Sequence, residues 1–256
     1  MRWPGWSAIL PRMPDFLDHA LAAILILALP PRAWLAFRTL LRAGAEQRPA
    51  VRKRLYLGAM LTQWALAAIV ILRWLLSRRL WTAIGLVPVI TPGASGVGIG
   101  VTVIVILSVM QLRATSGDSE VFERARARLQ HVEPLLPHSP GELQRFRMVA
   151  VTAGICEELL FRGFLIWYFA HYTGLIQAAL ISSVSFGLGH AYQGVRYVFV
   201  TGLLGAFLAA VYLISGSIVL SMLIHTLMDL YSGWVGYRLF GGAGGAAAPA
   251  DPEAPA

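Results

Sequence analysis

The chain has 256 residues, of which 57% are hydrophobic and only 13% carry a charged side chain. Soluble globular domains carry about 25% charged residues, so this composition excludes an ordinary soluble domain and indicates a protein embedded in a lipid bilayer. The net charge of +8 is typical of the cytoplasmic loops of such proteins, and we expect no nucleic-acid partner.

Seven stretches approach the roughly 20 apolar residues that a membrane-spanning helix needs. They predict an all-α fold, a polytopic transmembrane helical bundle of about seven to eight spans. The first stretch contains Pro30 and Pro31, which we expect to break it, and a further stretch at 80–91 is too short to span. The seven stretches are 16–37, 56–76, 95–112, 148–169, 174–190, 197–214 and 218–239.

Basic residues between the spans indicate the orientation of the chain. Residues 32–54 carry seven basic side chains and residues 113–147 carry six, and such loops stay in the cytoplasm. Placing both loops inside puts the N-terminus outside and the C-terminus inside, but leaves Arg78 and Arg79 on the wrong side. Because twenty Arg stand beside one Lys in an Ala-rich chain, we expect a GC-rich bacterial source and a multi-pass protein of the inner membrane.

The chain divides into four segments. Residues 1–112 are expected to hold N-terminal transmembrane helices, 113–147 a cytoplasmic linker with an amphipathic helix, 148–240 a helical core, and 241–256 a disordered tail. Near the end of the linker, Ser139, Pro140 and Glu142 predict a helix start, with Ser139 as N-cap and Glu142 as its capping-box partner. We expect this helix to run directly into the core.

The core contains few ionisable side chains, and helical spacing pairs them. Glu157 and Glu158 lie in an apolar stretch, where an unpaired charge costs roughly 2.5–3.5 kcal/mol. Glu158 and Arg162 are four residues apart and share a helix face. His225 and Asp229 have the same spacing.

Under the proposed orientation, four of these side chains reach similar depths in the cytoplasmic half of the membrane. One hypothesis is that they hold a divalent metal, for example zinc; the other is that Glu157 activates water directly as a general base while the histidines bind the developing oxyanion. Either route hydrolyses an amide, and Glu158 with Arg162 forms the structural pair. Each pair alone could be a buried packing contact, but their joint occurrence favours a functional site. The four residues are Glu157, His190, His225 and Asp229.

Three patterns in the core resemble the three motifs of the CPBP intramembrane proteases, a family that includes the type II CAAX prenyl endopeptidases and the bacterial Abi homologues. The patterns are Glu157-Glu158-x-x-x-Arg162, Phe186-x-x-x-His190 and His225-x-x-x-Asp229, and the resemblance covers roughly 145–240. It implies an intramembrane endopeptidase that cuts a membrane-embedded or lipidated protein or peptide.

The resemblance also implies roles for these residues, and makes 148–240 the catalytic core. Glu157 would be the catalytic base, and Glu158, Arg162 and Phe186 would support the site that His190, His225 and Asp229 line. The third motif ends in Asn in many members of the family, and the Asp of this chain adds a negative charge that would suit a cation. The family has been described both as metal-dependent and as glutamate-dependent, so a metal cofactor and none both stay open.

Two other classes of protein remain as alternatives. One is a non-catalytic membrane protein of the same fold that acts in immunity or as a scaffold. The other is a proton-coupled transporter, because chains of Glu, Asp and His also serve as proton relays. The complete set of three motifs favours the enzyme, and an N-terminal half without matching polar residues argues against the transporter.

Overall fold

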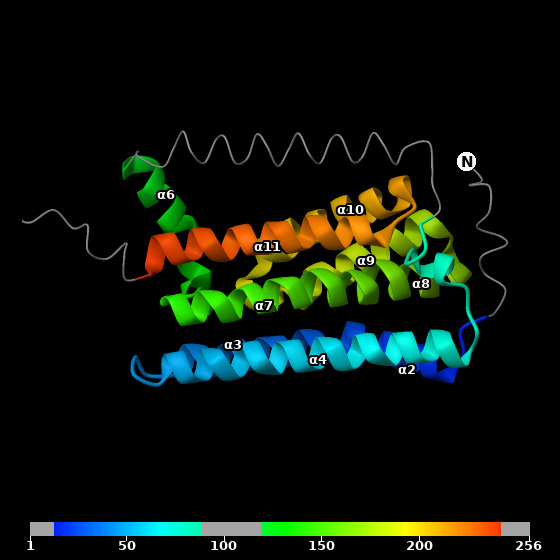
Figure 1. Cartoon of the computed structure of the whole chain (residues 1–256), viewed down its shortest axis with the longest axis horizontal. Helices are drawn as coiled ribbons and strands as arrows, with labels where there is room; N and C mark the ends of the chain where they lie inside the picture. Colours follow the sequence, from blue (N-terminus) through cyan, green and yellow to red (C-terminus); the bar gives the residue numbers. More distant parts are fainter. Residues whose placement is uncertain (1–12, 89–118, 242–256) are drawn as a thin grey trace, which may run out of the picture.

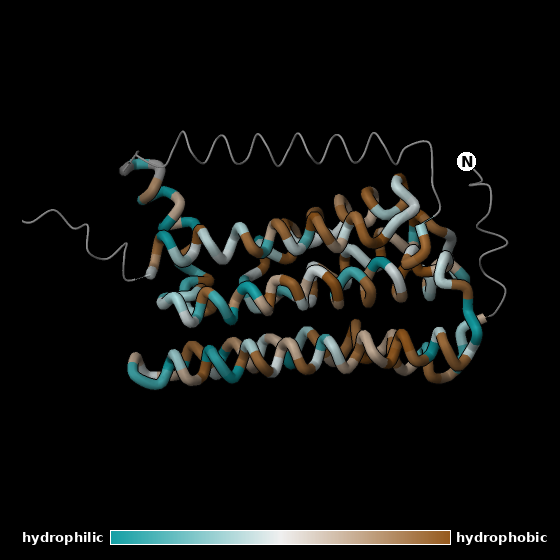
Figure 2. Tube along the Cα trace, in the orientation of Figure 1, coloured by the Kyte–Doolittle hydropathy of each residue, from teal (hydrophilic) through white to brown (hydrophobic). Residues whose placement is uncertain are grey.

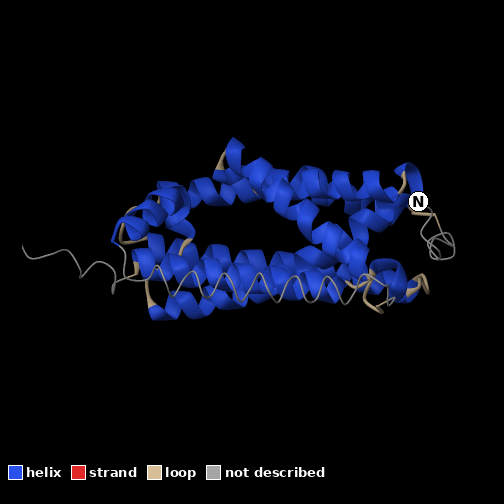
Figure 3. Cartoon of the chain, turned by 90° about the horizontal axis from the view of Figure 1, so that it is seen from above, coloured by secondary structure: helices blue, strands red, loops and turns tan. Residues whose placement is uncertain are grey.

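The computed structural model describes residues 13–88 and 119–241 (Figures 1 and 3). Helices make up 87% of this part of the chain and strands none of it, which confirms the predicted all-helical fold. The predicted span at 95–112 lies outside the described residues, and so does almost all of the predicted tail.

The first span is one continuous helix, so the predicted break at Pro30 and Pro31 is wrong. It consists of α2 (Phe16–Ala23), η1 (Ile24–Ala28) and α3 (Leu29–Arg42). Prolines lack the N–H that an α-helix needs. The wider π-type turn η1, in which the Leu29 N–H donates to the Ile24 carbonyl, precedes them. The change in hydrogen-bond register lets the helix continue past both prolines.

The second span, α4 (Arg48–Leu76), lies along α2 and α3 (Figure 1). A short turn of helix, η2 (Trp81–Ile84), follows it. Between them, Arg79 forms a two-pronged ion pair with the fully buried Asp18, with Nη1 to Oδ1 at 2.9 Å. The charge of Arg79 is therefore neutralised within the bundle, which accounts physically for a basic residue on the side where the orientation rule does not expect one.

The linker contains α6 (Ser119–Leu129) and η3 (Gln130–Leu135), after which α7 (Pro140–Glu157) begins. The Oγ of Ser139 accepts from the Glu142 N–H at 3.3 Å, which confirms the predicted N-cap. The reciprocal half of the capping box is wrong, because the Glu142 carboxylate accepts from the backbone N–H of His138 at 2.8 Å and from Arg52 at 2.7 Å. This ion pair fastens the start of α7 to α4.

The helix that begins at α7 continues through η4 (Glu158–Leu165) and α8 (Ile166–Thr173), as predicted. The remaining elements are α9 (Leu175–Gly189), η5 (Ala191–Gln193), α10 (Val195–Ser215) and α11 (Ile218–Phe240). Helix α7 packs against α11 on one side and α4 on the other, and α9 packs against α8 and α10. Helix α7, the first part of this long helix, therefore lies between α4 and α11.

Four helices of the described part are long and apolar enough to cross a membrane: Phe16–Arg42, Arg48–Leu76, Val195–Ser215 and Ile218–Phe240. Large apolar side chains on them face outward; Leu61, Phe199 and Leu203 are 62%, 70% and 72% exposed. Figure 2 shows apolar residues along most of the bundle and polar ones gathered toward the end with α6 and the α3–α4 turn. These features indicate an integral membrane protein, while the count of seven to eight spans stays a prediction.

Candidate active site

A chain of three buried ionisable side chains forms the base of the site. The Nη1 of Arg162 donates to Glu158 Oε1 at 2.8 Å, and neither side chain has any exposed surface. The same carboxylate oxygen accepts from Nδ1 of His225 at 2.8 Å. Because a carboxylate paired with an arginine can only accept, the proton of neutral His225 is placed on Nδ1 and Nε2 is left for the site.

Phe186 packs at the centre of this group. The guanidinium carbon of Arg162 lies 4.2 Å from the centre of the Phe186 ring. The rings of His190 and His225 lie 4.8 Å and 5.8 Å from it, the latter edge-on at 85°. His190 is fixed further by its Nδ1, which donates to the Phe186 carbonyl at 2.9 Å and leaves its Nε2 available. All three motifs therefore meet at one aromatic ring.

Glu157 lies beside this chain. Its Oε2 is 4.0 Å from Nε2 of His225, and the Oδ2 of Asp229 is 3.7 Å from the same nitrogen. Both separations exceed a direct hydrogen bond of about 2.7–3.2 Å, so Nε2 of His225 faces two carboxylates without being bonded to either. The other oxygen of Glu157, Oε1, accepts from the Gln63 side-chain amide at 2.6 Å.

A close approach between α7 and α11 makes this geometry attainable. Gly154 faces Thr226 on α11, and a Cβ built on Gly154 would lie 2.1 Å from the Thr226 Oγ1. With no side chain at this position, the two backbones come near enough for His225 to reach Glu158. The π-type turns of η4 begin at Glu158, and such turns inside α-helices occur frequently at functional sites.

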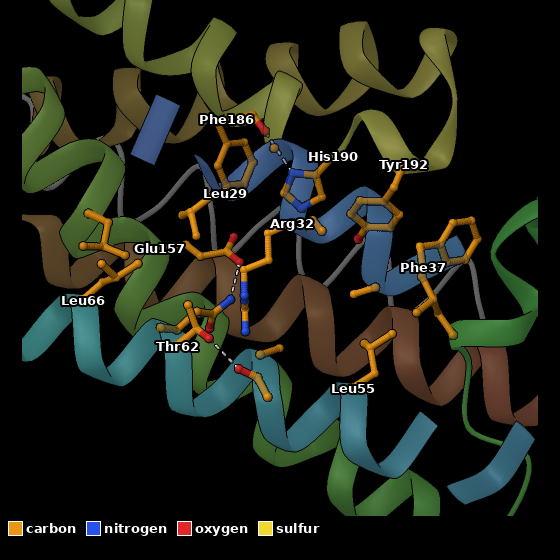
Figure 4. A pocket seen from close by; sticks show the side chains of 18 of the residues that line it. Leu29, Arg32, Phe37, Leu55, Thr62, Leu66, Glu157, Phe186, His190 and Tyr192 are labelled. Atoms are coloured by element: carbon orange, nitrogen blue, oxygen red, sulfur yellow. Dashed lines mark hydrogen bonds between the residues drawn. The ribbon is translucent and has the colours of Figure 1, made fainter. Parts of the chain in front are cut away.

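A cavity of about 350 Å³ opens beside Glu157 (Figure 4). Glu157 and His190 line it together with Phe186, Leu160 and Tyr192 from the core, and the opposite wall comes from α3 and α4. His225 and Asp229 are not among the residues that line this cavity. Burial raises the pKa of Tyr192 to about 12, so its phenol stays protonated and can donate a hydrogen bond.

The cavity wall includes polar side chains that the sequence interpretation missed. Arg32 comes from α3, and Thr62 and Gln63 come from α4. Gln63 stands in the predicted span at 56–76, where a carboxamide in an apolar stretch was the one available signal. Although the N-terminal half carries no polar residues that match those of the core, it contributes Gln63 to the cavity wall.

The side chains that could hold a metal do not gather as a coordination shell. Within residues 13–88 and 119–241, no three His, Cys, Asp or Glu side chains lie in an arrangement that could hold a metal ion. Nδ1 of His225 is hydrogen-bonded to Glu158 and Nδ1 of His190 to a carbonyl, so each imidazole has only Nε2 left as a possible metal ligand. As these side chains stand, Glu157, His190, His225 and Asp229 do not form a metal site.

Comparison with known proteins identifies the core. Residues 140–231 match the family model described as type II CAAX prenyl endopeptidase, Rce1-like. No curated protein and no solved structure gives a significant match to the chain. The matched segment contains all three motifs and every side chain of the buried chain from Arg162 to His225. The match confirms the resemblance that the motifs predicted: residues 140–231 are similar to the Rce1-like type II CAAX prenyl endopeptidases.

Proposed function

We propose that the chain is an intramembrane endopeptidase that hydrolyses a peptide bond of a membrane-embedded or lipidated protein or peptide, in a bacterial inner membrane. The observation that carries this proposal is the position of Glu157. Its carboxylate lines the cavity and also faces Nε2 of a histidine whose proton is placed by a buried ion pair. A packing residue needs neither a cavity nor an oriented histidine.

The geometry supports activation of water between Glu157 and His225. Two atoms 4.0 Å apart can both bind one water at the usual distance of about 2.8 Å. In the proposed reaction Glu157 takes one proton of this water, and the oxygen attacks the substrate carbonyl. The C–N bond then breaks, and Glu157 passes the proton to the leaving amine. When protonated at Nε2, His225 or His190 can donate to the oxyanion that forms.

The supporting residues act through His225. Glu158 and Arg162 hold each other in a fully buried pair, and Glu158 fixes the tautomer of the imidazole. Carboxylate partners of this kind orient histidines in many catalytic sites. Asp229 is 36% exposed and lies 3.7 Å from Nε2 of His225, so we propose that it assists protonation of His225 from the aqueous side.

The test compares wild type with Glu157→Gln, which keeps the shape of the side chain and removes the base. The matched control is Glu123→Gln on the exposed face of α6. The probes are an internally quenched peptide with a farnesylated CAAX sequence and its unprenylated counterpart, both in proteoliposomes. We expect Glu157→Gln, His190→Ala and His225→Ala to abolish cleavage, and Glu123→Gln to retain it.

Comparative membrane proteomics of cells carrying wild type or Glu157→Gln extends the test to natural substrates. We expect an uncleaved precursor to accumulate with the variant. Identical proteomes, together with no cleavage of either peptide by wild type, would favour the non-catalytic immunity or scaffold alternative. Metal analysis of the purified protein, with activity measured under chelation, decides between direct glutamate catalysis and a metal cofactor.

A further inference from the structure

We infer that Gln63 is a positioning residue for Glu157, so that the N-terminal helices complete the active site. This inference rests on the proposed function. Gln63 lies in the middle of α4, far outside the segment 140–231 that carries the motifs. Its Nε2 nevertheless donates to Oε1 of Glu157 at 2.6 Å.

The hydrogen bond distinguishes the two oxygens of Glu157. A free carboxylate can turn about its last side-chain torsion, which exchanges Oε1 and Oε2. With Oε1 held by Gln63, Oε2 is the oxygen that stays 4.0 Å from Nε2 of His225. Gln63 therefore keeps the proton-accepting oxygen pointed at the place where the attacking water has to lie.

A purely structural role for Gln63 does not account for its contacts. Two other contacts already join α4 to α7: Arg52 pairs with Glu142 at 2.7 Å, and Nε1 of Trp64 donates to Thr152 Oγ1 at 3.2 Å. The carbonyl oxygen of Gln63 is buried and has no hydrogen-bond partner in the described part of the chain. A side-chain amide that served only to join helices would be expected to form hydrogen bonds through both its NH2 group and its carbonyl oxygen.

The experiment replaces Gln63 by Met, which has a similar length and no N–H, and by Leu as a second apolar variant. The control is Thr152→Val, which removes a hydrogen bond between the same two helices without touching Glu157. Wild type, Gln63→Met, Gln63→Leu, Thr152→Val and Glu157→Gln are compared in proteoliposomes. For each we measure kcat and KM with the quenched farnesylated peptide, and the temperature of thermal unfolding.

We expect kcat of both Gln63 variants to fall by about 10-fold to 100-fold, by analogy with the loss seen when the hydrogen-bond partners that orient metal-binding side chains are removed. KM should stay within about twofold of wild type, because Gln63 acts on the base rather than on the substrate. Thr152→Val should keep its kcat, so that the loss of one interhelical hydrogen bond is not itself the cause.

Three results would overturn the inference while leaving the protease intact. The first is kcat within about twofold of wild type in Gln63→Met or Gln63→Leu while Glu157→Gln is inactive. The second is a raised KM with unchanged kcat, which would make Gln63 a substrate-binding residue. The third is a loss of kcat in Thr152→Val equal to that in Gln63→Met, which would assign both losses to helix packing. Cleavage by Glu157→Gln would instead refute the proposed function.

Discussion

Replacing Arg162 by Met should strand a carboxylate in the centre of the protein. Arg162 and Glu158 are both fully buried, and their contact at 2.8 Å joins a hydrogen bond from Arg162 to the Gly205 carbonyl at 3.2 Å. Removing one partner of a buried ion pair costs about 3–5 kcal/mol. For a chain of this size that corresponds to an unfolding temperature lower by about 6–20 °C.

A double variant separates the stranded charge from the loss of packing. Glu158→Gln together with Arg162→Met removes both charges, and replacing a buried pair by neutral groups is often close to neutral for stability. We therefore expect the double variant to recover most of the unfolding temperature. Its activity should stay low, because His225 loses the carboxylate that orients it.

A buried cysteine in the chain can report the unfolding temperature. Cys156 is the single cysteine of the chain and is fully buried, so a thiol-reactive fluorogenic dye in detergent micelles reads its exposure on heating. An Arg162→Met variant that unfolds within 2 °C of wild type, on the order of the shift for 1 kcal/mol, would refute the argument. So would a double variant that unfolds at as low a temperature as the single one.

Two further predictions concern contacts between helices. Gly154→Ala should lower both activity and unfolding temperature, because its Cβ would clash with Thr226. The control is Gly44→Ala, whose Cβ has open space around it. Equal activity and unfolding temperature in the two variants would contradict this prediction. Burial lowers the pKa of His131, whose ring stacks on Tyr197 with the ring centres 3.9 Å apart. The neutral imidazole therefore contributes its full share to the free energy of unfolding above about pH 6.5. This contribution is lost as the pH falls from 6.5 toward the lowered pKa. In an NMR titration, Tyr197→Ala should raise the midpoint of His131, and an unchanged midpoint would contradict that.

Local periodicity predicted the contacts of the site that lie on one helix. Glu158 and Arg162 meet because they are four residues apart, and the same spacing brings His225 near Asp229. The meeting of the three motifs followed from matching their depths in the membrane. Gln63 could not be assigned in this way, because which face of α4 contacts α7 depends on packing between helices that no spacing within one helix encodes.

The prediction of a break in the first span was wrong for a related reason. Pro30 removes one hydrogen bond of a regular α-helix, and that rule is correct locally. The η1 turn shifts the register of hydrogen bonds just before the proline, and Leu25 within that turn is fully buried. Packing of the surrounding helices can stabilise such a wide turn. A rule that considers the residues of one helix alone does not include this packing energy.

One face of α4 gives the cavity a wall that the chemistry does not use. Leu55, Gly58, Thr62 and Leu66 follow one another at helical spacing along the cavity. A Cβ at Gly58 would meet no atom within 4 Å, so a small side chain can be added to the cavity wall at this position. Under the proposed function, the size and shape of accepted substrates can therefore change, in evolution or in a library, while the three motifs of 140–231 stay the same.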